Sequence, residues 1–147
     1  MRAATLIILA LAAAAPAVGQ KYHHSCDYIS KSDSSGVPDK LKFKCKRTGG
    51  KSDDCTELTL ADCIGVDILY GSLEGRNSLN EHELFPYPHG CQGCKWDSEE
   101  TSLRCQCTNK DDKLAYLSTV HLDTRLSNYD GTIVGRVPQC RSKRVDC

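Results

Sequence analysis

Short stretches of alternating apolar and polar residues recur along this chain. The segment 41–45 (Leu-Lys-Phe-Lys-Cys) has the period of two that is typical of a strand with one buried face. Similar alternation returns at 57–60, 103–107 and 117–122, and a last short strand is expected at 133–137. The pattern predicts an all-β protein built from short strands.

Turn-forming sequences separate these strands. Thr48-Gly49-Gly50 follows the first strand, and Asp130-Gly131 is a dipeptide favoured in tight hairpins. The segments 61–64 and 123–126 each follow a return strand and contain Asp, so we expect about one turn of tight three-residue helix there. The Ser-, Asp- and Gly-rich segment 30–38 is interpreted as a turn.

The order of these features repeats within the chain. Cys45 and Leu60 have counterparts at Cys107 and Leu122, 62 positions later, and Gly71 has one at Gly131, 60 positions later. Such a period predicts two copies of one supersecondary unit, each too short to enclose a core alone. We therefore expect a single domain over residues 20–140. It consists of repeat one at about 22–76, a hinge at about 77–89 and repeat two at about 90–140. Residues 141–147 are expected to form a mobile basic tail that is anchored only through Cys147.

The first 19 residues are expected to be removed. Arg2 precedes an apolar run over 6–15, and Ala17-Val18-Gly19 supplies the small residues of a signal-peptidase site. The run is shorter than the roughly 20 residues of a membrane-spanning helix. Residues 1–19 are thus predicted to be a signal peptide, and the mature protein to be soluble, secreted and extracellular.

The ten cysteines all lie in the predicted mature chain. In an exported protein an even number indicates a disulfide framework. Antiparallel pairing of the two cysteine doublets predicts nested bridges, Cys91–Cys107 and Cys94–Cys105. A zinc site is disfavoured because Cys105 and Cys107 are separated by one residue, which is poor ligand geometry.

The net charge of the mature chain limits the classes of partner that it can bind. The mature chain has 18 basic side chains against 19 acidic ones. This near-balance argues against nucleic acid and against an anionic membrane, since both require a basic surface. The adjacent residues His23 and His24 are interpreted as surface histidines on opposite faces of a strand, and no metal site, cofactor or catalytic set is expected.

The repeat endings carry a family resemblance. Residues 122–133, which include Asn128-Tyr129-Asp130-Gly131, and their first-half counterpart 60–73 are similar to the repeats of the cyanovirin-N homology (CVNH) family. Cys45 and Cys107 also stand where that family places a half-cystine before a polar loop. The resemblance implies a pseudo-symmetric, two-lobe, all-β fold of tandem repeats with strands exchanged between them. It also implies a Cys26–Cys45 bridge; how Cys55, Cys63, Cys140 and Cys147 pair stays open.

The resemblance further implies a sugar pocket on each lobe. Carried over residue by residue, the first pocket consists of Lys21, His24, Ser25, Lys46, Arg47, Thr48, Asn128, Tyr129 and Asp130. The second consists of Thr108, Asn109, Lys110 and Tyr70, with Ile68 and Leu69 beside them. We expect this second pocket to be degenerate, because Ile68 and Leu69 lack polar side-chain groups and Tyr70 is bulky. An alternative interpretation of the first pocket is a solvated turn beside an ordinary charged hairpin.

The function implied is that of a non-enzymatic lectin. Its expected partners are mannose-containing glycans or glycoproteins, bound by a monomer or a strand-exchanged dimer. The alternative is a disulfide-stapled secreted effector that binds a protein partner, with degenerate sugar sites. Its interaction surface would then be the segment 77–89 together with the two-residue insertion before Gly71.

Overall fold

The computed structural model describes residues 20–34, 36–76, 84–99, 101–111, 113 and 117–147. The predicted signal peptide and part of the predicted hinge, residues 77–83, lie outside this range. Every regular element is a strand or a single turn of 3-10 helix, so the all-β prediction is confirmed for the described residues. Among them, no helix is long and apolar enough to cross a membrane. The elements are β1 Gln20–Lys21, η1 Tyr22–His24, β2 Cys26–Ser34, β3 Val37–Cys45, η2 Thr48–Gly50, β4 Asp54–Thr59, η3 Leu60–Asp62, β5 Ile64–Asp67, β6 Ser72–Gly75, β7 Phe85–Pro86, β8 Cys91–Asp97, β9 Ser102–Cys107, β10 Ser118–His121, η4 Leu122–Thr124, β11 Ser127–Tyr129, β12 Thr132–Val134 and β13 Lys143–Arg144.

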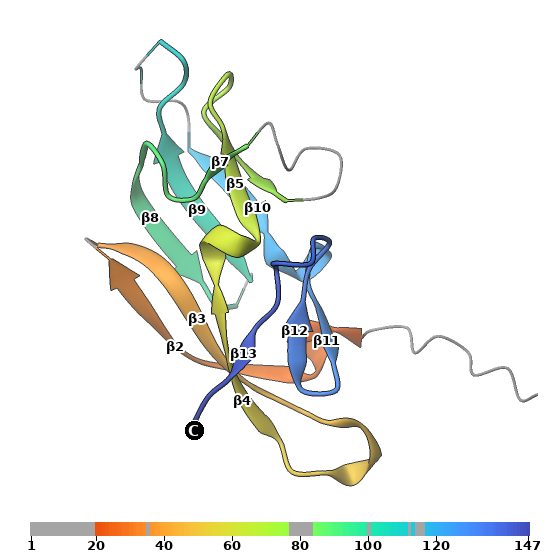
Figure 1. Cartoon of the computed structure of the whole chain (residues 1–147). Helices are drawn as coiled ribbons and strands as arrows, with labels where there is room; N and C mark the ends of the chain where they lie inside the picture. The colour runs from red at the N-terminus through yellow and green to blue at the C-terminus, as the bar shows by residue number, and fades with distance from the viewer. Residues whose placement is uncertain (1–19, 35, 77–83, 100, 112, 114–116) are drawn as a thin grey trace, which may run out of the picture.

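Two lobes form the molecule (Figure 1). The first contains the sheet β13-β4-β3-β2 and the sheet β1-β11-β12, and the second contains β10-β9-β8 and β6-β5-β7. The hairpin of β11 and β12 thus belongs to repeat two but packs against β4 of repeat one. Reciprocally, the hairpin of β5 and β6 packs against β10 and β9 of repeat two. Strands are therefore exchanged between the repeats, as the family resemblance implies.

The register shows how closely the repeats correspond. In the first lobe Gln20 of β1 pairs with Asn128, which also pairs with Ile133. In the second lobe Phe85 of β7 pairs with Val66, which also pairs with Leu73. Position 66 of the second lobe is thus the counterpart of position 128 in the first, a correspondence that matters for the candidate site.

Two buried tyrosines extend the same correspondence into the core. Tyr22 follows the two-residue strand β1 and Tyr87 follows the two-residue strand β7, and both side chains are almost completely buried. The Tyr87 hydroxyl donates a hydrogen bond of 2.7 Å to the carbonyl oxygen of Pro38 in the other repeat. Burial raises the pKa of Tyr22 and of Tyr87 far above the ordinary value, so both remain neutral.

Five disulfides staple this small core, and they use all ten cysteines. Three pairs are those expected: Cys26–Cys45, Cys91–Cys107 and Cys94–Cys105. The pairs that the sequence left open are Cys63–Cys140, which joins the two repeats, and Cys55–Cys147, which ties the end of the chain to β4.

Three sequence-based interpretations of elements are wrong. Residues 30–38 are not a turn, because β2 runs to Ser34 and β3 begins at Val37. The tail 141–147 is not mobile: β13 pairs with β4, and Ser142 is buried. The strand expected at 133–137 is β12, which ends at Val134, and it is followed by a further strand, β13. The described part of the predicted hinge also includes a strand, β7, between the buried residues Leu84 and Tyr87.

Candidate functional site

The nine residues expected in the first pocket come from three chain segments that meet at one end of the first lobe. Residues 21–25 run along β1 and η1, residues 46–48 follow β3, and residues 128–130 form the end of β11 and its turn. β1 pairs with β11, with Lys21 opposite Ser127. The backbone N–H of Lys46 donates a 2.8 Å hydrogen bond to the carbonyl oxygen of Ser25. Strand pairing therefore brings the three segments together.

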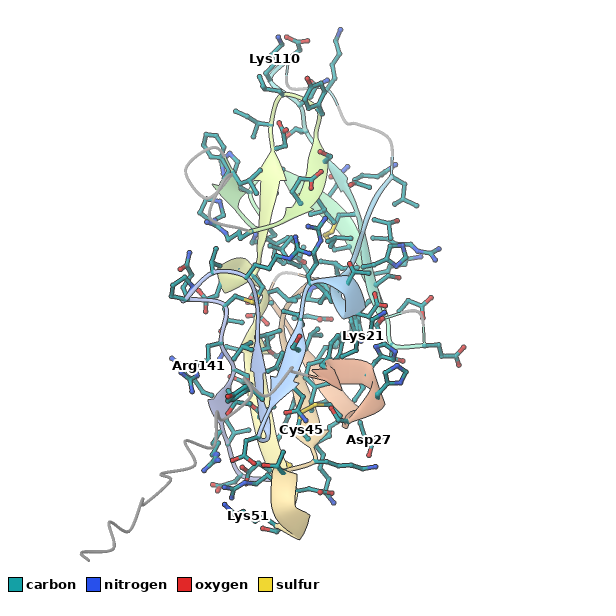
Figure 2. All side chains as sticks on the ribbon, turned by 90° about the vertical axis from the view of Figure 1, so that its right-hand side faces the viewer. Lys21, Asp27, Cys45, Lys51, Lys110 and Arg141 are labelled. Atoms are coloured by element: carbon teal, nitrogen blue, oxygen red, sulfur yellow. A yellow bond between two sulfur atoms is a disulfide. The ribbon has the colours of Figure 1, made fainter. Side chains whose placement is uncertain are left out.

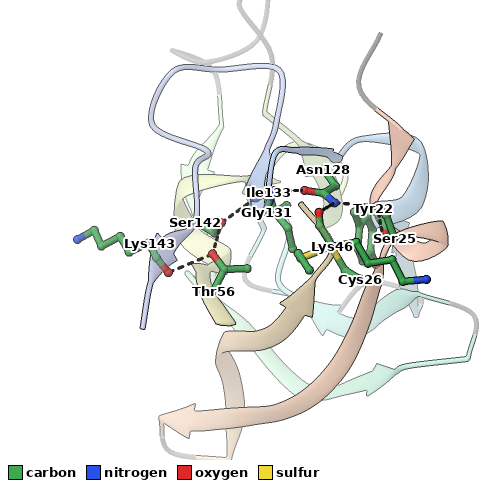
Figure 3. The surroundings of a disulfide bond; sticks show 11 residues. Tyr22, Ser25, Cys26, Lys46, Thr56, Asn128, Gly131, Ile133, Ser142 and Lys143 are labelled. Atoms are coloured by element: carbon green, nitrogen blue, oxygen red, sulfur yellow. Dashed lines mark hydrogen bonds between the residues drawn. A yellow bond between two sulfur atoms is a disulfide. The ribbon is translucent and has the colours of Figure 1, made fainter. Parts of the chain in front are cut away.

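Asn128 ties the segments together from inside (Figure 3). Its amide nitrogen donates to the Ser25 hydroxyl at 2.9 Å and to the carbonyl oxygen of Lys46 at 3.0 Å. Its amide oxygen accepts from the backbone N–H of Gly131 at 2.9 Å. Both Asn128 and Ser25 are buried. Of the nine expected residues, these two thus position the site, and the exposed members of the set present the polar groups to solvent.

The turn after β11 sets the direction of the Asp130 carboxylate. Asp130 and Gly131 both have positive φ angles, 49° and 85°, and they join Tyr129 to Thr132 as a two-residue hairpin. This is the tight turn that the Asp-Gly sequence predicts. A Cβ at Gly131 would lie 3.0 Å from Arg47 Cγ and from Asp54 Oδ2, so a side chain there would need both neighbours to shift, in addition to the strain of the positive φ.

Asp130 is the polar centre of the site. Its Oδ1 accepts hydrogen bonds from the backbone N–H of Thr48 at 3.0 Å and from the Thr48 hydroxyl at 2.9 Å. Its Oδ2 lies 3.6 Å from Arg47 Nη2. The two bonds from Thr48, followed by the charges of Arg47 and Lys51, hold the pKa of Asp130 below its ordinary value of 3.8. The carboxylate is thus charged and already oriented before any ligand arrives.

Two residues near Asp130 were missed by the sequence analysis. Asp54 lies opposite Cys45 in the β3–β4 ladder, with Oδ2 at 3.5 Å from Arg47 Nε and 2.9 Å from Arg144 Nε. Arg144 comes from β13, in the segment that was interpreted as a mobile tail. The signal for Asp54 was its place just before Cys55 at the start of a strand. Nothing in the sequence around Arg144 indicated that it lies near Asp130, because its position depends on the pairing of β13 with β4, about ninety residues earlier in the chain.

The outer surface of the site carries both donors and acceptors. Lys21, His24, Lys46 and Thr48 are exposed, and the Tyr129 side chain is 54% exposed beside Asp130. Lysine and guanidinium groups donate hydrogen bonds, the carboxylate accepts them, and the hydroxyls do both. An aromatic ring beside such a set can cover an apolar face of a ligand. This chemistry suits a neutral, polyhydroxylated ligand.

His23 and His24 do not lie on a strand. They belong to the 3-10 turn η1, and their ring centroids are 3.9 Å apart. The expectation that the two rings point to opposite faces was therefore wrong. Among the described residues, no group of three or more His, Cys, Asp or Glu side chains is arranged to hold a metal ion.

The second expected pocket lies at the opposite end of the molecule. Lys110 and Tyr70, which correspond there to Thr48 and Asp130, form no hydrogen bond with each other among the described residues. Figure 2 places Lys110 at one end and Lys51, next to the first site, at the other. The Asn109 carboxamide oxygen accepts from the backbone of Asp111 and Lys113 in its own loop. Tyr70 stands in the place of Asp130 and is 74% exposed. The described residues show no hydrogen bond or ion pair between 108–110 and 68–70.

The two-residue insertion explains part of this difference. Asp67 of β5 pairs with Ser72 of β6, so the turn of the second lobe has four residues, 68–71, where the first lobe has two. The longer turn is closed by Asp67, which accepts from the backbone N–H of Leu69 at 2.9 Å. The Asp67 carboxylate therefore accepts a hydrogen bond within its own turn, unlike the Asp130 carboxylate, which accepts from Thr48 of another segment.

Comparison with known families agrees with this arrangement. The sequence profile of the CVNH domain matches residues 22–134, more than half of the chain. The chain belongs to the CVNH domain family. The match excludes β13, Cys140 and Cys147, so Arg144 and two of the half-cystines lie outside the shared part of the CVNH domain.

Solved structures show the same fold. A MoCVNH3 variant (Mo0v), determined in complex with (N-GlcNAc)4, has a TM-score of 0.55 at 12% identity and covers 79% of this chain and 97% of its own. Microvirin, determined in complex with mannobiose, also has a TM-score of 0.55, at 23% identity, and covers 76% of this CVNH chain and 94% of its own. Against curated protein sequences the chain has no significant match.

Proposed function

We propose that this CVNH protein is a secreted lectin that binds mannose-type oligosaccharides without catalysis. The binding site is the surface around Thr48, Arg47 and Asp130, flanked by Tyr129. Support comes from membership of the CVNH family and from the sugars in the two similar structures, mannobiose with microvirin and (N-GlcNAc)4 with the MoCVNH3 variant. The predicted signal peptide and the five disulfides support export.

The observation that carries the proposal is the fixed Asp130 carboxylate. Thr48 holds one carboxylate oxygen with two hydrogen bonds, while the other oxygen lies beside Arg47. Vicinal sugar hydroxyls can donate to such an oxygen and accept from the guanidinium in the same plane. Because Asn128 and the Asp-Gly turn set this geometry in advance, little conformational entropy is lost on binding.

We propose one dominant glycan site per monomer. The second lobe has Tyr70 where the first has Asp130, and the carboxamide oxygen of Asn109 is occupied within its own loop. A sugar hydroxyl buried without its partner costs about 1–3 kcal/mol. The loss of two partners would therefore weaken a shallow site beyond easy detection. A monomer with one site should not cross-link glycoproteins.

The test compares matched variants at the two ends of the molecule on an oligomannose array and by calorimetry. We expect Arg47→Ala with Asp130→Ala to abolish binding, and Asn109→Ala with Lys110→Ala to leave it nearly unchanged. Since the Arg47 side chain is only 20% exposed and pairs with Asp54, Asp130→Ala alone is the sharper variant. Loss of binding in the second pair but not in the first would contradict the proposal.

A protein partner remains a second candidate because of one surface feature. The turn 68–71 of the second lobe presents Leu69, 57% exposed, and Tyr70, 74% exposed, to solvent. Adjacent exposed apolar side chains at a loop tip are typical of protein-binding surfaces. A blank glycan array obtained with correctly folded, oxidised protein would favour this candidate, and oligomannose binding removed by Asp130→Ala would favour the lectin.

A further inference from the structure

A pocket of about 320 Å³ lies between the two lobes; η1 contributes to it and to the candidate glycan site, but the pocket lining includes none of the nine residues of that site. Its walls come from η1 and the β2–β3 hairpin of repeat one, and from β8, the β8–β9 turn and η4 of repeat two. Its size falls in the range of small-molecule sites. The pocket is thus built jointly by the two repeats.

Aromatic rings form one wall of this pocket. Tyr28 and Phe43 meet at an interplanar angle of 71° with centroids 5.9 Å apart, and Tyr22 meets Phe43 at 74° and 5.4 Å. Trp96 lies 6.1 Å from Tyr28 at 41°. The rings therefore meet at interplanar angles between 41° and 74° and form a corner, instead of one flat stacking platform. Tyr28 and Trp96 are the partly exposed members, so part of each side chain is open to a ligand in the pocket.

The other wall is acidic. Glu99 is exposed and Asp123 is half-buried, and both line the pocket. Among the described lining residues there is no lysine or arginine. Asp123 and Tyr22 both line the pocket, and the pKa of the Tyr22 hydroxyl is raised mainly by burial and further by the Asp123 charge. The charge of the described walls is therefore complementary to a cation.

Among the described residues, the aromatic pair of this pocket has no equivalent in repeat two. By sequence position, Phe43 corresponds to Cys105, 62 residues later, and Tyr28 to Gly93, since each lies two residues after the first half-cystine of its hairpin; Cys105 is bridged to Cys94. The second repeat thus has a disulfide where the first has its aromatic pair. The Tyr28–Phe43 pair is thus found in repeat one only, so the corner that it forms with Trp96 of repeat two is separate from the paired sites that the tandem repeat predicts.

We propose that this pocket binds a compact organic ammonium cation, held between the aromatic corner and the carboxylates of Glu99 and Asp123. A cation over the face of tryptophan or tyrosine is attracted by the ring quadrupole, and carboxylates strengthen the binding of an ammonium group by charge-assisted hydrogen bonds or through-space attraction. The ammonium group can belong to a quaternary head group or to the free amine of an amino sugar, and the probes below distinguish these sources.

Trp96 makes the test direct because it is the only tryptophan in the chain. Its single indole N–H signal in a ¹⁵N correlation spectrum reports on this pocket alone. The full mature, oxidised protein is titrated with choline and with its neutral isostere 3,3-dimethylbutan-1-ol, and with glucosamine and glucose, at constant ionic strength. We expect at least one cation to shift the indole signal with an affinity about tenfold or more above that of its neutral partner. The responding cation identifies the source of the ammonium group.

Variants connect the response to the acidic wall. Glu99→Gln with Asp123→Asn should weaken the cation response about tenfold or more while the mannose-type binding stays unchanged. Should the double variant misfold, Glu99→Gln alone, at an exposed position, should still weaken it. Asp130→Asn, at the far end of the first lobe, should leave the cation response intact. Equal responses to cations and neutral isosteres, no response to either cation, or an unchanged response in Glu99→Gln would overturn the proposal.

Discussion

At position 128 the chain has a buried amide where the matching position of the other lobe has Val66. The valine contributes only apolar contacts, whereas Asn128 makes three hydrogen bonds that join the segments of the candidate site. This difference adds to the other two between the lobes, Tyr70 in place of Asp130 and the longer turn 68–71, in confining an oriented carboxylate to the first lobe. The sequence indicated Asn128 through the family motif, but it did not show that the amide faces inward.

Replacing Asn128 by alanine should destabilise the protein. The change removes the hydrogen bonds to the Lys46 carbonyl and from the Gly131 N–H, and it leaves the Ser25 hydroxyl with only its bond to the Tyr22 carbonyl oxygen. At about 1 kcal/mol for each bond we expect a loss of about 2–3 kcal/mol in the free energy of unfolding, measured by chemical denaturation. Asn109→Ala is the matched control, because that amide caps an exposed loop and its loss should cost less than about 1 kcal/mol. Equal losses would contradict the role of Asn128.

The Asp130 carboxyl should titrate below 3.8 in a carbon-detected NMR titration. Because the folded pKa lies below the ordinary value, the contribution to stability is complete above that value. It is lost as the pH falls through the lowered folded pKa. Thr48→Ala removes the hydrogen bond from the Thr48 hydroxyl to Asp130 and should move the pKa of Asp130 back toward 3.8. The pKa should not be fully restored, since the bond from the backbone N–H of residue 48 remains. An unchanged pKa in Thr48→Ala would show that Thr48 does not hold the carboxylate.

Among the elements, β2 shows why an edge strand is hard to recognise from sequence. Cys26 is buried, but from Ile29 onward the strand is exposed on both faces. Alternation of apolar and polar residues marks only strands with one buried face, so residues 30–34 resembled a turn. β3 lies between β2 and β4 and buries Leu41, Phe43 and Cys45, and there the alternation was plain.

The short exchanged strand β7 depends on close contact with Gly65. A Cβ at Gly65 would come within 2.5 Å of Leu84 Cβ and 3.1 Å of the Phe85 carbonyl oxygen. Gly65→Ala should therefore push β7 away from β5 and destabilise the protein by about 1–3 kcal/mol. Loss of hydrogen-exchange protection in β5 and around β7 would be the specific sign.

The control for Gly65→Ala is Gly36→Ala. Gly36 has nothing within 4 Å of the added Cβ but has a φ of +77°, so only backbone strain of about 1 kcal/mol is expected there. If Gly65→Ala is no worse than this control and keeps the protection of β5, the close packing of β7 is not needed for the fold.

For the whole molecule, the repeat and its exchanged strands followed from the 62-residue offset and the family resemblance, whereas the path of the chain's end did not. Nothing local in residues 141–147 favours a strand, because β13 exists through its pairing with β4 and through the Cys55–Cys147 bridge. The pairing of the last four cysteines was open for the same reason. Contacts between segments far apart in sequence leave little local signal.

Removing the Cys55–Cys147 bridge tests this long-range anchor. The bridge closes a loop with a sequence separation of 92, and Cys55→Ser with Cys147→Ser should cost about 2–4 kcal/mol in the free energy of unfolding. β13 should lose hydrogen-exchange protection. Arg144 would then lose its ion pair with Asp54, and we expect the Arg47 side chain to move toward Asp54 in its place. Since Arg47 would thereby move away from Asp130, glycan affinity should fall modestly. Full retention of both stability and β13 protection would contradict the anchoring role.

The central claim is that one end of the molecule, and not its pseudo-symmetric opposite, binds glycan. A ¹⁵N correlation titration of the mature oxidised protein with mannobiose tests it residue by residue. The account predicts saturable shifts at Lys46, Arg47, Thr48 and at 128–131, a stoichiometry of one, and unchanged signals at 68–71 and 108–110. Saturable shifts confined to 68–71 and 108–110, or equal shifts at both ends, would contradict it.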